Sequence, residues 1–207
     1  ILFLISPIAA LLTPLGYFSG DVSTGEHRMF FTHMMIAAGG LAPALLMLKL
    51  GPALACARNK CHNGQRALWS ALSMSVLLFA CGGVLGGMIE GQNVVIPAHY
   101  HGSIIGVTLA FMGASYVWLP LFGYRDPAGW RLAYWQPIVY GGGQLLHIGG
   151  LAWSGGYGVL RKTPGALEGG FTAAKAAMGL MGLGGLMAAV GGLMFVVVVI
   201  RSVFYKD

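Results

Sequence analysis

Charged side chains are scarce in this chain of 207 residues. They make up 9% of the sequence, whereas hydrophobic residues make up 57%. Soluble globular domains carry about 25% charged residues. So low a charge content, combined with 34 glycines, excludes an ordinary water-soluble domain and indicates helices packed within a membrane. We therefore expect membrane lipid to surround the chain.

Cysteine is also rare, since only Cys56, Cys61 and Cys81 occur. An odd number of cysteines gives no framework of paired disulfides. Cys61-His62 also lacks the second cysteine, two residues earlier, that covalent attachment of c-type haem requires. We expect these three residues to be ordinary thiols.

Six apolar stretches are each near the roughly 20 residues needed to cross the hydrocarbon core of a bilayer. They cover approximately residues 1–18, 29–50, 67–89, 98–122, 131–157 and 175–203. The pattern predicts an all-α fold, a polytopic membrane helix bundle of about six transmembrane helices in a single domain over residues 1–207. Ile1 already lies in an apolar run with no basic segment before it, so no signal peptide is visible and we expect an incomplete N-terminus.

Basic residues gather in alternate loops, which predicts the orientation of the bundle. The basic set comprises Arg58, Lys60, Arg66, Arg125, Arg131, Arg201 and Lys206. This side is expected to be cytoplasmic, in the inner (plasma) membrane of a bacterium or archaeon. The net charge of +6 then sets topology and implies no nucleic-acid partner.

Two histidines, His99 and His101, stand at the start of the fourth span, near the predicted outer face. Helix positions i and i+2 point to faces about 200° apart, so the two imidazoles cannot share one metal ion but can each bind a different one. Ionisable residues inside membrane spans are usually functional, and imidazole is an axial ligand of haem iron. The alternative is a pair of interfacial histidines, one hydrated and one bonded to a carbonyl.

Two further histidines and several glycines have simpler interpretations. His147, three residues after Gln144, is expected in a helix contact more than as a ligand, and His33 in packing more than in a proton relay. Small residues four apart predict close helix contacts at Gly82 with Gly86, Gly83 with Gly87, and Gly184, Ala188 and Gly192. Gly141 to Gly143 favour a close helix crossing, with room for a flat ring as the alternative.

Several motifs together resemble subunit I of the haem-copper oxygen reductases, most like the B-type branch. Ile96-Pro97-Ala98-His99-Tyr100-His101 resembles the start of that family's tenth helix, and Phe79 to Gly87 its glycine-rich ninth helix. Gly150 to Gly155, followed by Arg161 and Lys162, resembles the eleventh helix and its basic pair. Thr13-Pro14-Leu15-Gly16 resembles the approach to the copper ligands on the seventh. The resemblance covers nearly the whole chain and implies the C-terminal half, helices seven to twelve, of a twelve-helix subunit.

The resemblance also implies a set of cofactor ligands. His99 corresponds to the proximal ligand of a high-spin haem, His101 to an axial ligand of a low-spin haem, and Arg161 and Lys162 to residues that hold haem propionates. One or two haems of b- or a-type are therefore expected. The family's adjacent copper-binding histidines are replaced here by approximately Phe18-Ser19, and no histidine precedes His27, so the chain offers no evident copper site.

These observations leave three functions open. The first is a haem-binding membrane subunit of a respiratory oxidoreductase that transfers electrons between haems towards a gas-reducing site. The second is a copper-less, oxidase-derived cytochrome that only relays electrons from a quinol or c-type cytochrome to a partner enzyme. The third is a bundle without haem, whose histidines line a proton or ion path. The first two require other membrane subunits, including one that supplies the missing N-terminal helices.

Overall fold

The computed structural model describes residues 2–18, 20–57, 65–160 and 173–204. Within these ranges the chain is almost entirely helical, and each of the six predicted stretches is a helix. The chain divides into two compact units, residues 1–55 and 56–207. That all six helices form a single domain stays a prediction.

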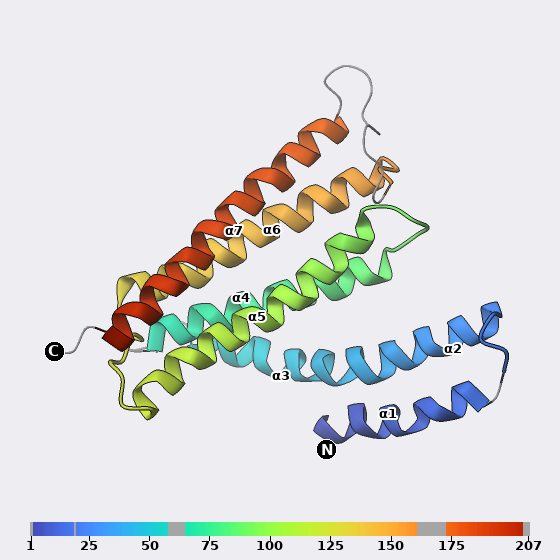
Figure 1. Ribbon diagram of the computed structural model, residues 1–207, viewed down its shortest axis with the longest axis horizontal. Helices are drawn as coiled ribbons and strands as arrows, with labels where there is room; N and C mark the ends of the chain where they lie inside the picture. Colours follow the sequence, from blue (N-terminus) through green and yellow to red (C-terminus); the bar gives the residue numbers. More distant parts are fainter. Residues whose placement is uncertain (1, 19, 58–64, 161–172, 205–207) are drawn as a thin grey trace. The chain divides into compact units, whose positions relative to one another are not determined.

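The first unit contains α1 (Leu2–Phe18), α2 (Gly25–Met35), η1 (Ile36–Leu41) and α3 (Ala42–Ala57), in blue at the start of the chain in Figure 1. The Oγ1 atom of Thr24 accepts a hydrogen bond of 3.2 Å from the backbone N–H of His27, which caps the start of α2. The helix therefore begins at Gly25, before the start at residue 29 predicted from hydropathy. Its first turn is polar and so has low hydropathy, but the cap stabilises it. The segment η1 is a π-helical turn that continues the helix into α3.

Aromatic side chains join α1 to α2 in this unit. The ring of Phe31 lies 4.8 Å from that of Tyr17 and 4.7 Å from that of His27, centroid to centroid. The hydroxyl of Ser6 also donates to the carbonyl oxygen of Ala38 in η1. The short α1 is thus fixed at both ends against the helix that follows it.

The second unit contains α4 (Arg66–Gly87), α5 (Val95–Leu121), α6 (Arg131–Gly156) and α7 (Ala173–Phe204). Figure 1 shows α4 beside α5 and α6 beside α7, and these two pairs have the most extensive contacts. Successive helices are antiparallel, so the start of α5 and the end of α6 lie at one end. There Asn93 and Leu160 form an isolated β-bridge, and the N–H of Val94 donates to the carbonyl of Val159 over 3.1 Å.

Glycines allow α4 and α5 to approach each other closely. A Cβ atom on Gly102 would lie 2.7 Å from the Cα of Gly82, and one on Gly106 would lie 2.8 Å from the backbone nitrogen of Phe79. Of the two predicted pairs, Gly82 and Gly86 make such contacts. A Cβ atom added to Gly83 or Gly87 would have no described neighbour within 4 Å. This second pair, although it has the same spacing, therefore makes no close helix contact among the described residues.

Small residues play the same part between α6 and α7. A Cβ atom on Gly143 would lie 2.8 Å from the carbonyl oxygen of Gly184, and Ala188 is 3% exposed. The contact continues at Gly191, which faces the backbone of Tyr140, whereas Gly192 has only an ordinary 3.9 Å neighbour. The prediction of a close contact is therefore wrong for Gly192. An α-helix has 3.6 residues per turn, so residues spaced four apart turn progressively away from the neighbouring helix. Gly143 also confirms the helix-crossing interpretation of the glycine triplet.

A buried polar network connects three helices of this unit. The hydroxyl of Tyr116 on α5 donates to Oε1 of Gln136 on α6 over 2.8 Å. The Nε2 atom of Gln136 donates to the carbonyl oxygen of Gly191 on α7 over 3.3 Å. Both side chains are 0% exposed. Because unpaired polar groups are costly in such surroundings, these bonds fix the register of the three helices.

Four helical segments in the described residues are long and apolar enough to cross a membrane: Gly25–Leu54, Arg66–Gly87, Val95–Leu121 and Ala173–Phe204. The helix α1 is apolar but shorter. The helix α6 is 26 residues long, and it carries Gln136, Gln144 and His147 among its glycines, which lowers its hydropathy. It packs against α4, α5 and α7. The chain is an integral membrane protein.

Candidate functional site

His99 projects from the second turn of α5 towards α4. Its Nδ1 atom lies 2.7 Å from the carbonyl oxygen of Gly82, within hydrogen-bonding distance. A carbonyl oxygen can only accept, so Nδ1 carries the proton in this contact, and in the neutral imidazole Nε2 keeps its lone pair. A metal-binding histidine is commonly oriented in this way, by a backbone carbonyl on the nitrogen that does not bind the metal.

The position of the His99 ring depends on a second glycine of α4. A Cβ atom on Gly86 would lie 2.7 Å from Nδ1 and 2.8 Å from Cε1 of His99. The small residues at 82 and 86 therefore do more than bring two helices together, since they also provide the space and the acceptor that orient this imidazole.

His101 faces a different neighbour. Its ring lies 5.0 Å from the ring of His147 on α6, at an interplanar angle of 74°, and 4.9 Å from the ring of Tyr100. Within the described residues no hydrogen bond to a nitrogen of His101 is formed, so both nitrogens are free for other ligands. The two histidines of α5 thus point to different helices, as their spacing predicts.

His147 has two contacts, of which the sequence predicts one. Its Nδ1 atom lies 3.0 Å from the carbonyl oxygen of Met181 on α7, which is the expected helix contact. Its approach to His101 was not foreseen, because it depends on the relative register of α5 and α6. The sequence feature that could have indicated a second contact of His147 is the presence of two polar side chains, Gln144 and His147, in an otherwise apolar helix.

The remaining candidates lie elsewhere. Arg161 and Lys162 lie outside the described residues, although the chain is described up to Leu160, which pairs with Asn93 just before α5. His33 is exposed on α2 in the first unit. Phe18 ends α1 and is 88% exposed, and Ser19 lies outside the described residues. In the part of the chain that the structure describes, no three His, Cys, Asp or Glu side chains form a group, but a haem iron needs only one or two protein ligands.

Sequence comparison finds relatives without an assigned activity. No protein-family model matches the chain. An uncharacterized protein of Rickettsia prowazekii (strain Madrid E) is 33% identical over an alignment 233 residues long, gaps included, which covers 96% of this chain and 45% of that protein. An uncharacterized protein of Aquifex aeolicus (strain VF5) is 33% identical over 60 residues, covering 29% of this chain and 16% of that protein. The chain thus spans less than half the length of these relatives.

Structural comparison identifies the fold. The cryo-EM structure of a heme-copper terminal oxidase dimer matches 100% of this chain and 41% of the matched chain, with a TM-score of 0.66 and 17% sequence identity. At this identity the likeness concerns the fold. The resemblance predicted from the sequence is confirmed at that level: the chain has the fold of part of a haem-copper terminal oxidase.

Proposed function

We propose that this chain is the haem-binding part of a respiratory membrane oxidoreductase, and that it transfers electrons between haems towards a gas-reducing site. The oxidase-like fold of an integral membrane protein supports this assignment. The observation that carries it is the 2.7 Å contact between Nδ1 of His99 and the carbonyl oxygen of Gly82. That contact leaves Nε2 as the free donor atom inside a membrane span, where an imidazole without a role is costly.

His99 and His101 would each hold a different iron. A haem bound at either residue would supply a redox-active iron, and the iron held by His99 would be the one that binds a small gas. The α4 backbone orients the first imidazole through Gly82, and the ring of His147 restricts the second from the α6 side. The bridge between Asn93 and Leu160 brings the chain that precedes Arg161 and Lys162 to the start of α5. This supports the proposal that these two cations hold haem propionates.

The proposed haem sites require further helices. The chain covers 41% of the oxidase chain that it resembles, so we propose that other membrane helices complete the haem sites, either from a separate subunit or from the same polypeptide. A quinol or a c-type cytochrome would donate the electrons. The histidine end of α5 would face the outer side of a bacterial or archaeal plasma membrane.

Substitution of the two histidines tests the ligand assignment. His99→Ala and His101→Ala should each remove a different haem signal from the reduced-minus-oxidised spectrum of the purified complex. His33→Ala is the matched control, because His33 is exposed on α2, and it should leave both signals unchanged. If both α5 variants keep the complete spectrum, the ligand assignment is wrong. If the unchanged complex shows no haem signal at all, a bundle without haem, with histidines on an ion path, becomes the better explanation.

A second function is favoured by the residues around the end of α1. By the resemblance, approximately Phe18-Ser19 correspond to the family's histidine pair, which favours a copper-less cytochrome that only relays electrons. Metal analysis separates the two functions. Copper together with haem, and a spectral shift with carbon monoxide, would support the gas-reducing enzyme, whereas haem without copper would support the electron relay.

A further inference from the structure

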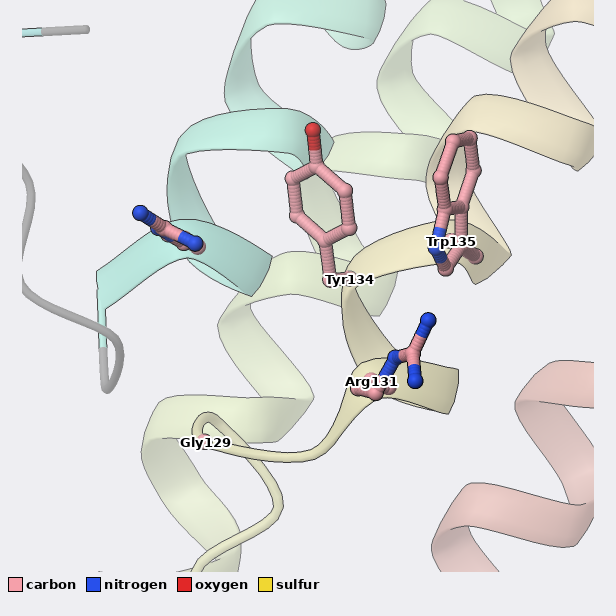
Figure 2. A pocket seen from close by; sticks show the side chains of 5 residues that line it. Gly129, Arg131, Tyr134 and Trp135 are labelled. Atoms are coloured by element: carbon pink, nitrogen blue, oxygen red, sulfur yellow. The ribbon is translucent and has the colours of Figure 1, made fainter. Parts of the chain in front are cut away.

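A cavity of about 350 Å³ lies at the end of the second unit that is remote from His99. Its lining comprises Arg66, Gly129, Arg131, Tyr134 and Trp135. Figure 2 shows Arg131, Tyr134 and Trp135 on the first turns of α6, where all three line the cavity. Arg66 comes from the first turn of α4. Two cations and two aromatic rings thus surround one opening.

The charge of this cavity is not neutralised by the described part of the chain. Neither Arg66 nor Arg131 forms an ion pair there. Asp126, the acid of the neighbouring loop, instead accepts a hydrogen bond of 2.8 Å from the N–H of Ala128. Nor does a side chain cap either helix, since Gln65 before α4 and Trp130 before α6 form no capping hydrogen bond, and no acidic residue lies in either first turn. Positive charge and unpaired N–H groups therefore favour an anion in the cavity.

The aromatic lining indicates what carries the anion. Tyr134 and Trp135 lie with their rings 5.3 Å apart, at an interplanar angle of 74°, and Trp135 is 48% exposed. Exposed tryptophan near the end of a membrane helix is typical of the level of the lipid headgroups. Basic pockets between transmembrane helices on the cytoplasmic side bind the headgroups of anionic lipids. This end also carries Arg125 and Arg201, in agreement with the predicted cytoplasmic side.

We propose that this cavity is a binding site for the phosphate group of an anionic phospholipid in the cytoplasmic leaflet. Arg131 and Arg66 contact the phosphate oxygens, the first turns of α4 and α6 contribute N–H groups, and Trp135 packs against the glycerol region. The lipid would thereby fix the start of α6 against the start of α4. No residue of this site belongs to the histidine site at the start of α5, although α4 and α6 contribute residues to both.

Lipid retention by the purified protein tests the proposal. Native mass spectrometry with added phosphatidylglycerol or phosphatidylcholine should show preferential retention of phosphatidylglycerol by the unchanged protein. Arg131→Gln should weaken that retention roughly tenfold, because a charge-assisted contact to phosphate is lost. Arg66→Gln should act in the same direction, and Arg131→Lys should have a smaller effect, because lysine keeps the charge but not the two-pronged geometry.

Arg201→Gln is the matched control. Arg201 lies at the same end, with its guanidinium 5.3 Å from the centroid of the Trp130 ring, and it does not line the cavity. Its loss removes one charge and should leave lipid retention unchanged. Equal weakening by Arg201→Gln and Arg131→Gln would overturn the site in favour of a diffuse surface charge. Equal retention of the two lipids would also overturn it. Binding of inorganic phosphate that depends on Arg131, without retention of phosphatidylglycerol, would overturn the lipid as the source of the phosphate.

Discussion

At the scale of single residues, Gly86 determines where the imidazole of His99 can lie. Its missing side chain leaves the space that the ring uses to reach the carbonyl oxygen of Gly82. This dependence makes Gly86 a positioning residue for the proposed haem ligand, although it lies on a different helix from His99.

We expect Gly86→Ala to displace the His99 ring, since the new methyl group would lie 2.7 Å from Nδ1. Overpacking of this kind costs about 1–3 kcal/mol. Thermal unfolding should therefore shift down, and the haem signal that depends on His99 should shift or weaken while the other signal remains. Gly87→Ala is the control, because no described atom lies within 4 Å of the added carbon. Equal effects of the two variants would contradict the positioning role.

Residue spacing predicted the divergent directions of His99 and His101, because two positions along a helix determine an angle without any tertiary information. It did not predict the contact of His101 with His147, nor the cavity beside Arg66 and Arg131. The contact and the cavity both depend on the relative positions of neighbouring helices along their axes. The sequence likewise could not distinguish Gly82 and Gly86, which contact α5, from Gly83 and Gly87, which do not. Because both glycine pairs have the same spacing, the sequence does not show which pair faces the neighbouring helix.

At the scale of helices, each of the six apolar stretches predicted from hydropathy is helical, and four helical segments of the described residues are long and apolar enough to cross a bilayer. Hydropathy misplaced the start of α2, where Thr24 caps a polar turn. It also gave no sign of the polar network between Tyr116 and Gln136, because a glutamine in an apolar span does not reveal its partner. That network is the contact by which α5, α6 and α7 share a register.

We expect Gln136→Leu to destabilise the bundle by about 1–3 kcal/mol, because the hydroxyl of Tyr116 would stay buried without its acceptor. The double variant Tyr116→Phe with Gln136→Leu should recover part of this loss, since it removes both partners. Denaturation of the unchanged protein, the two single variants and the double variant in detergent measures the coupling. Ser115→Ala, which removes an exposed hydroxyl bonded within α5, should change stability by less than about 0.5 kcal/mol. Strict additivity of the two core substitutions would contradict the network.

At the scale of the whole molecule, cations in the second unit are distributed unequally between its two ends. Arg66, Arg125, Arg131 and Arg201 lie at the start of α4 and α6 and the end of α5 and α7. Among the described residues, Glu90 and Lys175 lie at the opposite end: Glu90 in the short connection between α4 and α5 that precedes His99, and Lys175 in the first turn of α7. This asymmetry is the physical basis of the predicted orientation.

Cysteine labelling in sealed vesicles tests that orientation. In a variant whose three native cysteines are replaced by serine, Tyr124→Cys should react with a membrane-impermeant reagent only from the cytoplasmic side. Gln92→Cys should react only from the opposite side. Both positions are exposed in connections between helices, so accessibility does not limit either reaction. Labelling in the reverse sense would place the histidines near the cytoplasm and refute the proposed topology.

The π-helical turn at Ile36–Leu41 has a consequence for changes in chain length. Such a turn accommodates an additional residue without interrupting the helix. Gly39 and Gly40 have no described neighbour within 4 Å of an added Cβ atom, so the surrounding described residues do not require glycine at either position. Deletion of either residue would restore regular winding, preserve the helix content measured by circular dichroism, and rotate every side chain of α3 by about 100° relative to α2. Insertions and deletions at this turn are therefore a route by which homologous chains could present a different side of one helix to lipid or to a neighbouring subunit.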